Sequence, residues 1–298
     1  MLSPLGRLYG ASVARKARAA KPYRSSARVI CIGNLTAGGS GKTPVAIAVA
    51  QRLIDWEKKV FFLTRGYGGS EPGPVLVSAQ DARAVGDEAL LLARLAPTVV
   101  AQDRAQGARF AAAKGAEVIV MDDGHQNFTL AKDLSFVVAG NFGNGLMIPA
   151  GPLREPVAQG LARADAVVVM DNAALDLGSF RGAVLHARLE LDGGGLAGRR
   201  IFAFAGIGQP EKFLRSLKEA GAIVTGHRFF ADHHFYTPME LNQLREEAKG
   251  AVLITTEKDL VRLSAEERQG IEVLKVRAVF ERPALLDKLL ASGAMSSI

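Results

Sequence analysis

Thr36-Ala37-Gly38-Gly39-Ser40-Gly41-Lys42-Thr43 is the stretch that decides the fold class of this chain. The apolar run Val29-Ile30-Cys31-Ile32 precedes it, and a helical pattern rich in alanine and valine follows over 44–50. Strand, glycine-rich loop, Gly-Lys-Thr and helix in this order are typical of a phosphate-binding loop. Glycines let successive backbone N–H groups approach phosphate oxygens, and the helix adds the positive end of its dipole.

The loop departs from the usual pattern G-x-x-x-x-G-K-[ST] at its first position, where Thr36 replaces glycine. A chance glycine-rich turn before a helix is the alternative, but the order of strand, loop, lysine, threonine and helix favours a nucleotide site. We expect Lys42 to reach the β- and γ-phosphates of ATP and the Thr43 hydroxyl to bind Mg²⁺. The predicted nucleotide contacts are Thr36, Ala37, Gly38, Gly39, Ser40, Gly41, Lys42 and Thr43.

Composition indicates a globular α/β protein. The chain has 298 residues, of which 48% are hydrophobic and 22% charged, enough for one large core or two smaller ones. The single cysteine, Cys31, excludes an internal disulfide and fits a reducing compartment. We expect neither a transmembrane helix nor a signal peptide, because no apolar run is long enough and the N-terminus has no continuous apolar core.

The net charge of +7 is concentrated at the N-terminus. Residues 1–28 carry seven basic residues and no acid, whereas the rest of the chain is balanced. In a helix, Leu2, Leu5, Leu8, Tyr9 and Val13 share one face and most of the arginines lie opposite, with Lys16 breaking the pattern. Such an arm suits an anionic membrane surface, and the alternatives are a helix packed on the body or a nucleic-acid arm.

Apolar runs alternate with helical patterns along the remaining chain, which predicts a mainly parallel sheet covered on both faces. The expected strands of the first series are 28–32, 59–63, 97–101, 117–121, 134–139 and 165–170, and the expected helices are 44–56, 86–95 and 104–114. We predict four parts: a basic amphipathic arm at 1–28, a phosphate-loop lobe at 29–183, linker strands at 184–200 and a smaller C-terminal α/β lobe at 201–298.

Two carboxylates follow the apolar strand 117–121. Asp122 and Asp123 stand at its carboxyl end, where a Walker-B aspartate holds Mg²⁺ beside the phosphate loop. Asp122 is the better metal ligand because it follows the strand directly. The alternative is an ordinary strand-end aspartate that caps a turn.

Four other segments carry polar groups that have more than one interpretation. Asp87 and Glu88 open a helical pattern, so they are either helix-capping acids or site residues. Asp232-His233-His234 suggests metal ligands, a surface loop or an acid–base pair, although its spacing matches no zinc pattern. Arg65 and Arg154 each adjoin glycine-rich backbone and suit phosphate, with structural salt bridges as the alternative.

Together these segments resemble the lipid A 4′-kinase (tetraacyldisaccharide 4′-kinase) family. The motifs that carry the resemblance occur in family order: the run Ile32 to Pro44, Arg65-Gly66-Tyr67-Gly68, Gly86-Asp87-Glu88, Asp122-Asp123-Gly124-His125-Gln126, Gly151-Pro152-Leu153-Arg154-Glu155, Asp232-His233-His234 and Thr256-Glu257-Lys258-Asp259. His125 replaces the phenylalanine associated with its loop, which leaves its contact with substrate open. Threonine at the first position of the phosphate loop is itself a trait of the family.

The resemblance implies transfer of the ATP γ-phosphate to the 4′-hydroxyl of a tetraacylated glucosamine disaccharide 1-phosphate. It implies a cytoplasmic-face inner-membrane enzyme of lipid A synthesis, with two α/β lobes, a two-stranded linker and a basic N-terminal helix at the membrane. No nucleic acid and no obligate protein partner are expected.

Residue roles follow from the same resemblance and from the needs of phosphoryl transfer, namely charge neutralisation, alignment and removal of the hydroxyl proton. Lys42 and Mg²⁺ are expected to neutralise charge, with the ion held by Thr43 and Asp122 and with Glu88 in its shell. Asp87 resembles the family's catalytic base, with His233 as the partner that orients it. The expected substrate-side residues are Arg65, Asp123, Arg154 and Glu155.

A different class of protein remains an alternative. A regulatory or partitioning ATPase at the membrane would explain the phosphate loop, Asp122 and the basic arm without lipid phosphorylation. It would not explain the Asp87 and His233 pair. A soluble small-molecule kinase is the second alternative, and it predicts a dispensable arm.

Overall fold

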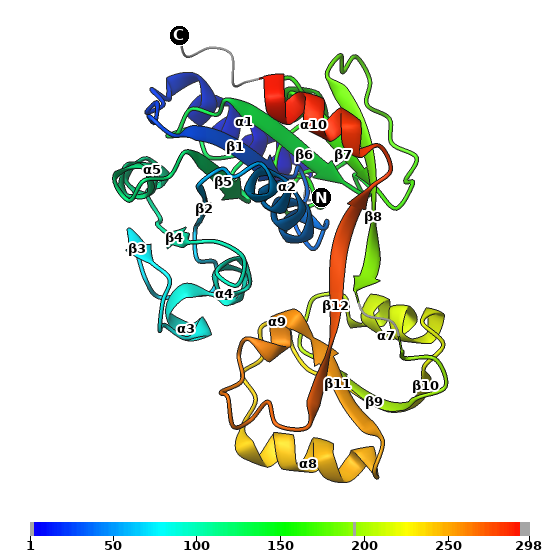
Figure 1. Ribbon diagram of the computed structural model, residues 1–298. Helices are drawn as coiled ribbons and strands as arrows, with labels where there is room; N and C mark the ends of the chain where they lie inside the picture. The colour runs from blue at the N-terminus through cyan, green and yellow to red at the C-terminus, as the bar shows by residue number, and fades with distance from the viewer. Residues whose placement is uncertain (1–2, 193–194, 293–298) are drawn as a thin grey trace.

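Two α/β lobes joined by a pair of long strands make up the computed structural model, which describes residues 3–192 and 195–292 (Figure 1). The N-terminal lobe contains strands β1 (Arg28–Gly33), β2 (Val60–Thr64), β3 (Val75–Leu76), β4 (Thr98–Val100), β5 (Val118–Asp122), β6 (Leu134–Ala139) and β7 (Ala166–Met170). Its helices are α1 (Ser3–Ala19), α2 (Lys42–Asp55), α3 (Ala82–Val85), α4 (Asp87–Leu92), α5 (Arg104–Ala113) and α6 (Val157–Leu161).

The C-terminal lobe contains β9 (Arg200–Ala205), β10 (Ile223–Phe229) and β11 (Val252–Thr256), with helices α7 (Pro210–Glu219), α8 (Pro238–Ala248) and α9 (Glu257–Leu260). The connecting strands are β8 (Ala183–Asp192) and β12 (Ile271–Phe280), and helix α10 (Pro283–Ser292) follows. Figure 1 shows β8 and β12 running side by side between the lobes. The predicted α/β class with a β linker is confirmed.

Strand order places the phosphate loop beside Asp122. The order is β10-β9-β11-β12-β8-β7-β6-β1-β5-β2-β4-β3, with β1 parallel to both β5 and β6. Ile32 of β1 is in register with Asp122 of β5, so the loop after β1 and this carboxylate emerge at the same sheet edge. Ligands of parallel α/β sheets bind at this edge, where the strands end.

Successive residues of β1 face opposite layers of helices. Ile30 and Ile32 pack in the core that contains α2, whereas Val29 and Cys31 pack in the core on the α5 side. This two-sided burial follows from the period of two in a strand and explains why β1 is a continuous apolar run. The C-terminal lobe is built the same way, with α7 and α8 on separate cores of its parallel strands.

The end of the chain differs from the expected boundary of the C-terminal lobe, 201–298. β12 carries the chain back, and α10 buries Leu286 and Leu290 in the α2 core of the N-terminal lobe. Arg52 of α2 donates two hydrogen bonds of 2.6 Å to the carboxylate of Asp287. The long antiparallel pairing of β12 with β8 causes this return, which local sequence patterns do not encode.

Helix α1 is attached to the N-terminal lobe through small residues. A Cβ added at Gly10 would lie 2.5 Å from Met147 Sδ, so the helix approaches this loop closely there. Leu5, Leu8 and Tyr9, which the helical pattern of the sequence places on one face, are exposed, while Leu2 lies outside the described residues. Within the part of the chain that the structure describes, no helix has the length and apolar character needed to cross a membrane.

Candidate active site

The loop between β1 and α2 has the backbone that phosphate binding requires. Gly38 has φ 104° and Gly41, which caps α2, has φ 83°, in a region that residues with side chains rarely adopt. Added Cβ atoms at Gly38 and Gly39 would meet no atom within 4 Å. The glycines therefore leave open space above the loop and the N-terminus of α2, where an anion is favoured.

Thr36 explains why the first glycine of the usual motif is dispensable here. It forms an antiparallel bridge with Leu153, and the neighbouring Ala37 N–H donates to Pro152 O at 2.7 Å. Thr36 is in consequence held in extended backbone and has no positive φ. Asn34 stabilises the loop by donating from Nδ2 to Thr36 O at 2.6 Å and to Ser40 Oγ at 2.9 Å.

Asp122 lies at the carboxyl end of β5 and is buried under the loop. Its Oδ2 accepts a 3.0 Å hydrogen bond from Thr43 Oγ1, whereas its buried Oδ1 accepts none from the described residues. Burial, followed by the charges of Glu88 and Asp123, raises the pKa of Asp122 to about 7. A buried carboxylate oxygen without a partner, beside a hydroxyl, is a suitable donor set for Mg²⁺, which also takes water and phosphate ligands.

No group of three or more metal-ligating side chains occurs in the described residues. Mg²⁺ usually takes only one or two protein carboxylates and completes its shell with water and phosphate oxygens. Thr43 and Asp122 are thus the residues whose geometry fits the ion.

Asp123 has a different environment from its neighbour. Its φ is 51°, which turns the side chain away from the strand direction. It lies 3.7 Å from Lys42 Nζ and accepts hydrogen bonds of 3.1 and 3.2 Å from Arg154. Burial raises its pKa, but Lys42 and Arg154 outweigh burial and hold the pKa below its ordinary value. Asp123 therefore holds both the lysine of the phosphate loop and Arg154.

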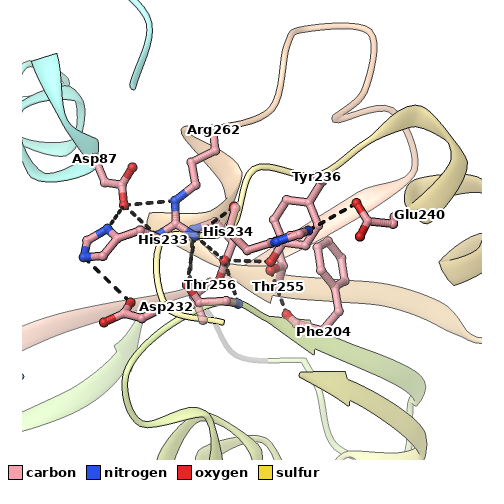
Figure 2. A network of polar contacts seen from close by, with 12 residues as sticks. Asp87, Phe204, Asp232, His233, His234, Tyr236, Glu240, Thr255, Thr256 and Arg262 are labelled. Atoms are coloured by element: carbon pink, nitrogen blue, oxygen red, sulfur yellow. Dashed lines mark hydrogen bonds and ion pairs between the residues drawn. The ribbon is translucent and has the colours of Figure 1, made fainter. Parts of the chain in front are cut away.

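Asp87 and His233 meet across the two lobes (Figure 2). Asp87 is the first residue of α4 in the N-terminal lobe, and His233 lies in the loop after β10, with φ 61°. His233 Nδ1 donates to Asp87 Oδ2 at 2.8 Å, and its ring lies 5.7 Å from that of Tyr67. The hydrogen bond to Asp87 raises the pKa of His233 above its ordinary value. Burial by itself would raise the pKa of Asp87. The hydrogen bonds from His233 and Arg262 outweigh burial and hold this pKa below its ordinary value, so the carboxylate is ionised.

Glu88, the next residue of α4, forms a second link between the lobes. Lys258 Nζ of α9 lies 2.8 Å from Glu88 Oε1. Burial lowers the pKa of Lys258, but Glu88 outweighs burial and raises the pKa above its ordinary value, so the ammonium is charged. Glu88 is close enough to raise the pKa of Asp122, which brings it near the predicted metal site, although its direct partner is a lysine.

Four further positions that the sequence analysis noted have separate surroundings. His125 is buried, with Nε2 donating to Gly160 O at 2.9 Å and Nδ1 3.3 Å from Ser135 Oγ, so it is part of the core. Glu155 is also buried, and its carboxylate accepts hydrogen bonds from Gln126 and Arg163. It therefore stabilises its own loop and is not exposed for contact with substrate. Arg65 is exposed at the end of β2. His234 turns away from Asp87 and contacts Glu240 at 3.2 Å.

Two site residues were not predicted from the sequence. Arg262, in the turn after α9, contacts Asp87, and Lys258 contacts Glu88. The run Thr256-Glu257-Lys258-Asp259 was noted as a motif, but no role followed from it. The available signal was its position: polar residues directly after β11, at the carboxyl edge of a parallel strand.

The fold and the site define a class of protein. A phosphate-binding loop, a buried strand-end carboxylate and an aspartate–histidine pair beside them are the parts of a P-loop phosphotransferase with two lobes. Residues 1–294 match the family model described as tetraacyldisaccharide-1-P 4′-kinase. The chain belongs to this family.

Individual relatives agree with the family match over nearly whole chains. The tetraacyldisaccharide 4′-kinase of Paramagnetospirillum magneticum is 51% identical, covering 97% of this chain and 93% of that protein. The protein of the same description from Rhodospirillum centenum is 47% identical, covering 98% and 90% respectively. Among solved structures, that of LpxK from Aquifex aeolicus in complex with ATP has a TM-score of 0.81 at 29% identity and covers 98% of both chains.

Proposed function

We propose that this protein transfers the γ-phosphate of ATP to the 4′-hydroxyl of a tetraacylated glucosamine disaccharide 1-phosphate, a step of lipid A biosynthesis. The single observation that carries the proposal is the 2.8 Å contact of Asp87 with His233 at the interface between the lobes. A protein that only bound or hydrolysed ATP would not need a hydrogen-bonded base from two lobes. Family membership supplies the acceptor, since the relatives are tetraacyldisaccharide 4′-kinases.

Nucleotide binding is assigned to the phosphate loop. Backbone N–H groups of the loop and Lys42 bind the phosphates, and Thr43 and Asp122 would hold Mg²⁺. When bound, this ion neutralises charge on the phosphate oxygens during transfer. Asp123 keeps the ammonium of Lys42 and the guanidinium of Arg154 directed toward the same region, as its 3.7 and 3.1 Å contacts indicate.

Asp87 is assigned as the general base. Its carboxylate accepts the proton of the acceptor hydroxyl as the new oxygen–phosphorus bond forms and the bond between the γ-phosphorus and the β–γ bridging oxygen breaks, so that ADP leaves. His233 orients the carboxylate by donating from Nδ1 to Oδ2. Arg65 and Arg154 are the residues whose charge suits a phosphate of the acceptor.

The acceptor is a lipid, and α1 has the features of an interfacial helix. Leu5 and Leu8 are 53% and 68% exposed, and Arg15, Lys16 and Arg18 are also exposed. Apolar side chains can enter the headgroup region while the cations contact anionic lipids. We assign the protein to the cytoplasmic face of the inner membrane, bound peripherally through this helix.

The decisive experiment is incubation with ATP, Mg²⁺ and a tetraacylated disaccharide 1-phosphate, followed by mass analysis of the lipid. The expected product is heavier by one phosphate at the 4′ position, and Asp87→Asn should not form it. ATP hydrolysis with unchanged lipid would instead identify a regulatory ATPase.

A further inference from the structure

Arg262 is a fully enclosed charged group between the lobes. None of its side chain is exposed, and the guanidinium bonds in two directions (Figure 2). On one side, Nε and Nη2 donate to Asp87 Oδ2 at 2.9 and 2.5 Å. On the other side, Nη1 donates to Asp259 Oδ1 and Gly206 O, both at 2.9 Å. The arginine therefore bridges α4 of one lobe and the strand ends of the other.

The two oxygens of Asp87 have unequal surroundings. His233 and Arg262 both donate to Oδ2, at 2.8 Å and at 2.5 and 2.9 Å. Oδ1 receives no hydrogen bond from the described residues. It also does not belong to the fully buried side-chain atoms of these residues that lack a hydrogen-bond partner. The carboxylate plane is thus held by one oxygen, and the other is left for a proton donor that comes from outside the protein.

The far end of Arg262 is fixed by Asp259. This carboxylate is fully buried and accepts hydrogen bonds from the Gly206 N–H at 2.8 Å and the Tyr236 hydroxyl at 2.8 Å. Thr256 Oγ1 donates to its other oxygen at 2.6 Å. An arginine side chain has many rotamers, but a buried carboxylate that is itself held on several sides selects one of them. The planar guanidinium then fixes the direction of its hydrogen bonds as well as the position of its charge.

We propose that Arg262 is a positioning residue for phosphoryl transfer, which holds Asp87 Oδ2 together with His233 so that Oδ1 faces the acceptor hydroxyl. The inference rests on the proposed function, because Asp87 is the base there. It adds a requirement: the base is oriented only when the Asp259–Arg262 unit of the C-terminal lobe is docked against α4. A phosphate-loop ligand bound to the N-terminal lobe alone does not depend on it.

The test is Arg262→Ala with a guanidinium rescue, assayed with lipid acceptor and ATP. Loss of orientation should lower kcat by roughly 10- to 100-fold, whereas KM for ATP should change little because the phosphate loop is untouched. Added guanidinium, at concentrations far below the denaturing range, should restore part of kcat by filling the vacated space. Arg268→Ala is the matched control: Arg268 Nε donates to Leu260 O at 3.0 Å in the same lobe, and this variant should keep its kcat and not respond to guanidinium.

Two results would overturn the inference. One is a normal kcat in Arg262→Ala. The other is a loss of kcat that guanidinium does not restore and that is matched by losses of ATP affinity and thermal stability, as for a purely structural residue. If Arg262→Ala does not fold, Arg262→Lys decides, since it keeps the charge without the fork: reduced kcat supports the role and unchanged kcat refutes it. An active Asp87→Asn would instead refute the proposed base, independently of Arg262.

Discussion

Lys42 is the residue whose loss should separate catalysis from folding. Its ammonium lies among the phosphate loop, Asp123 and Arg154, where charge develops on the transferring group. We expect Lys42→Ala to abolish measurable transfer, at a cost of at least about 3 kcal/mol in transition-state stabilisation. Single-turnover phosphorylation of the lipid, with thermal unfolding of the same samples, measures both effects.

Exposed Lys58, just after α2, provides the control for that experiment. Lys58→Ala changes the same charge at a place remote from the loop and should be fully active. Near-normal turnover in Lys42→Ala would remove this lysine from the mechanism.

His125 should make the stability of the protein sensitive to acid. Burial, followed by the charges of Lys132 and Arg163, lowers its pKa to about 3. The pKa of His125 in the folded protein is below the value of about 6.5 in the unfolded chain, so the unfolded state binds a proton first as the pH falls. The contribution of this group to the free energy of unfolding is therefore present above about pH 6.5 and is lost as the pH falls. Between pH 6.5 and pH 5 the loss should be about 1.6 kcal/mol from this group alone.

Urea unfolding of the wild type and of His125→Gln at several pH values measures this effect. The amide can still donate to Gly160 O, and the profile of the variant should be flatter over the same range. Substitution of the exposed His227 by glutamine is the control and should leave the profile unchanged. Equal slopes for the wild type and His125→Gln would contradict a neutral, buried His125.

Helix α1 is an element whose two faces should have separable roles. Its glycine face approaches Met147, and its exposed face carries Leu5, Leu8 and Tyr9. We expect Leu8→Ser to weaken binding to anionic vesicles by roughly 5- to 10-fold, because about 1 kcal/mol of apolar transfer is lost. Vesicle co-sedimentation measures it, and salt should weaken binding further through the basic residues.

Met239→Ser is the matched control for Leu8→Ser. Met239 on α8 and Leu8 are both 68% exposed, so the two substitutions remove comparable apolar surface. Only the change in α1 should affect vesicle binding. Equal effects of the two variants on vesicle binding would show that α1 serves only in packing. Vesicle binding that does not change when residues 1–20 are removed would show the same.

The whole molecule is tested by the pair that joins its lobes. Asp87 and His233 belong to different lobes and act on one proton, so their substitutions should not add. Asp87→Ala and His233→Ala should each reduce kcat by roughly 100-fold or more, and the double variant should be little worse than the poorer single variant. ATP affinity, measured by calorimetry, should change far less.

His234 is the control for this double-mutant cycle. Its ring stacks on Phe230 with centroids 4.7 Å apart and contacts Glu240, away from Asp87. His234→Ala should retain more turnover than His233→Ala. Fully additive losses, or a larger defect at His234, would mean that the reacting pair has been assigned to the wrong residues.

Local elements were predictable because their causes are local. β6 was expected over 134–139 and occurs with those bounds, and the helix expected over 44–56 occurs as α2 over Lys42–Asp55. The phosphate loop and Asp122 were found because consecutive residues specify strand, turn and helix. The short elements β3, α3, α6 and α9 were not predicted, since two to five residues carry little periodic signal.

The amino-acid sequence by itself determined the α/β class, the phosphate loop with its adjoining carboxylates, and the family. Those features depend on backbone preferences and burial patterns over short spans, or on motifs in a set order. Only the tertiary structure decided that α10 returns to the N-terminal lobe, that His125 and Glu155 are buried supports, and that Arg262 holds the proposed base. Asp87 is 146 residues from His233 and 175 from Arg262, and such contacts form only when two lobes are brought together by the paired strands β8 and β12.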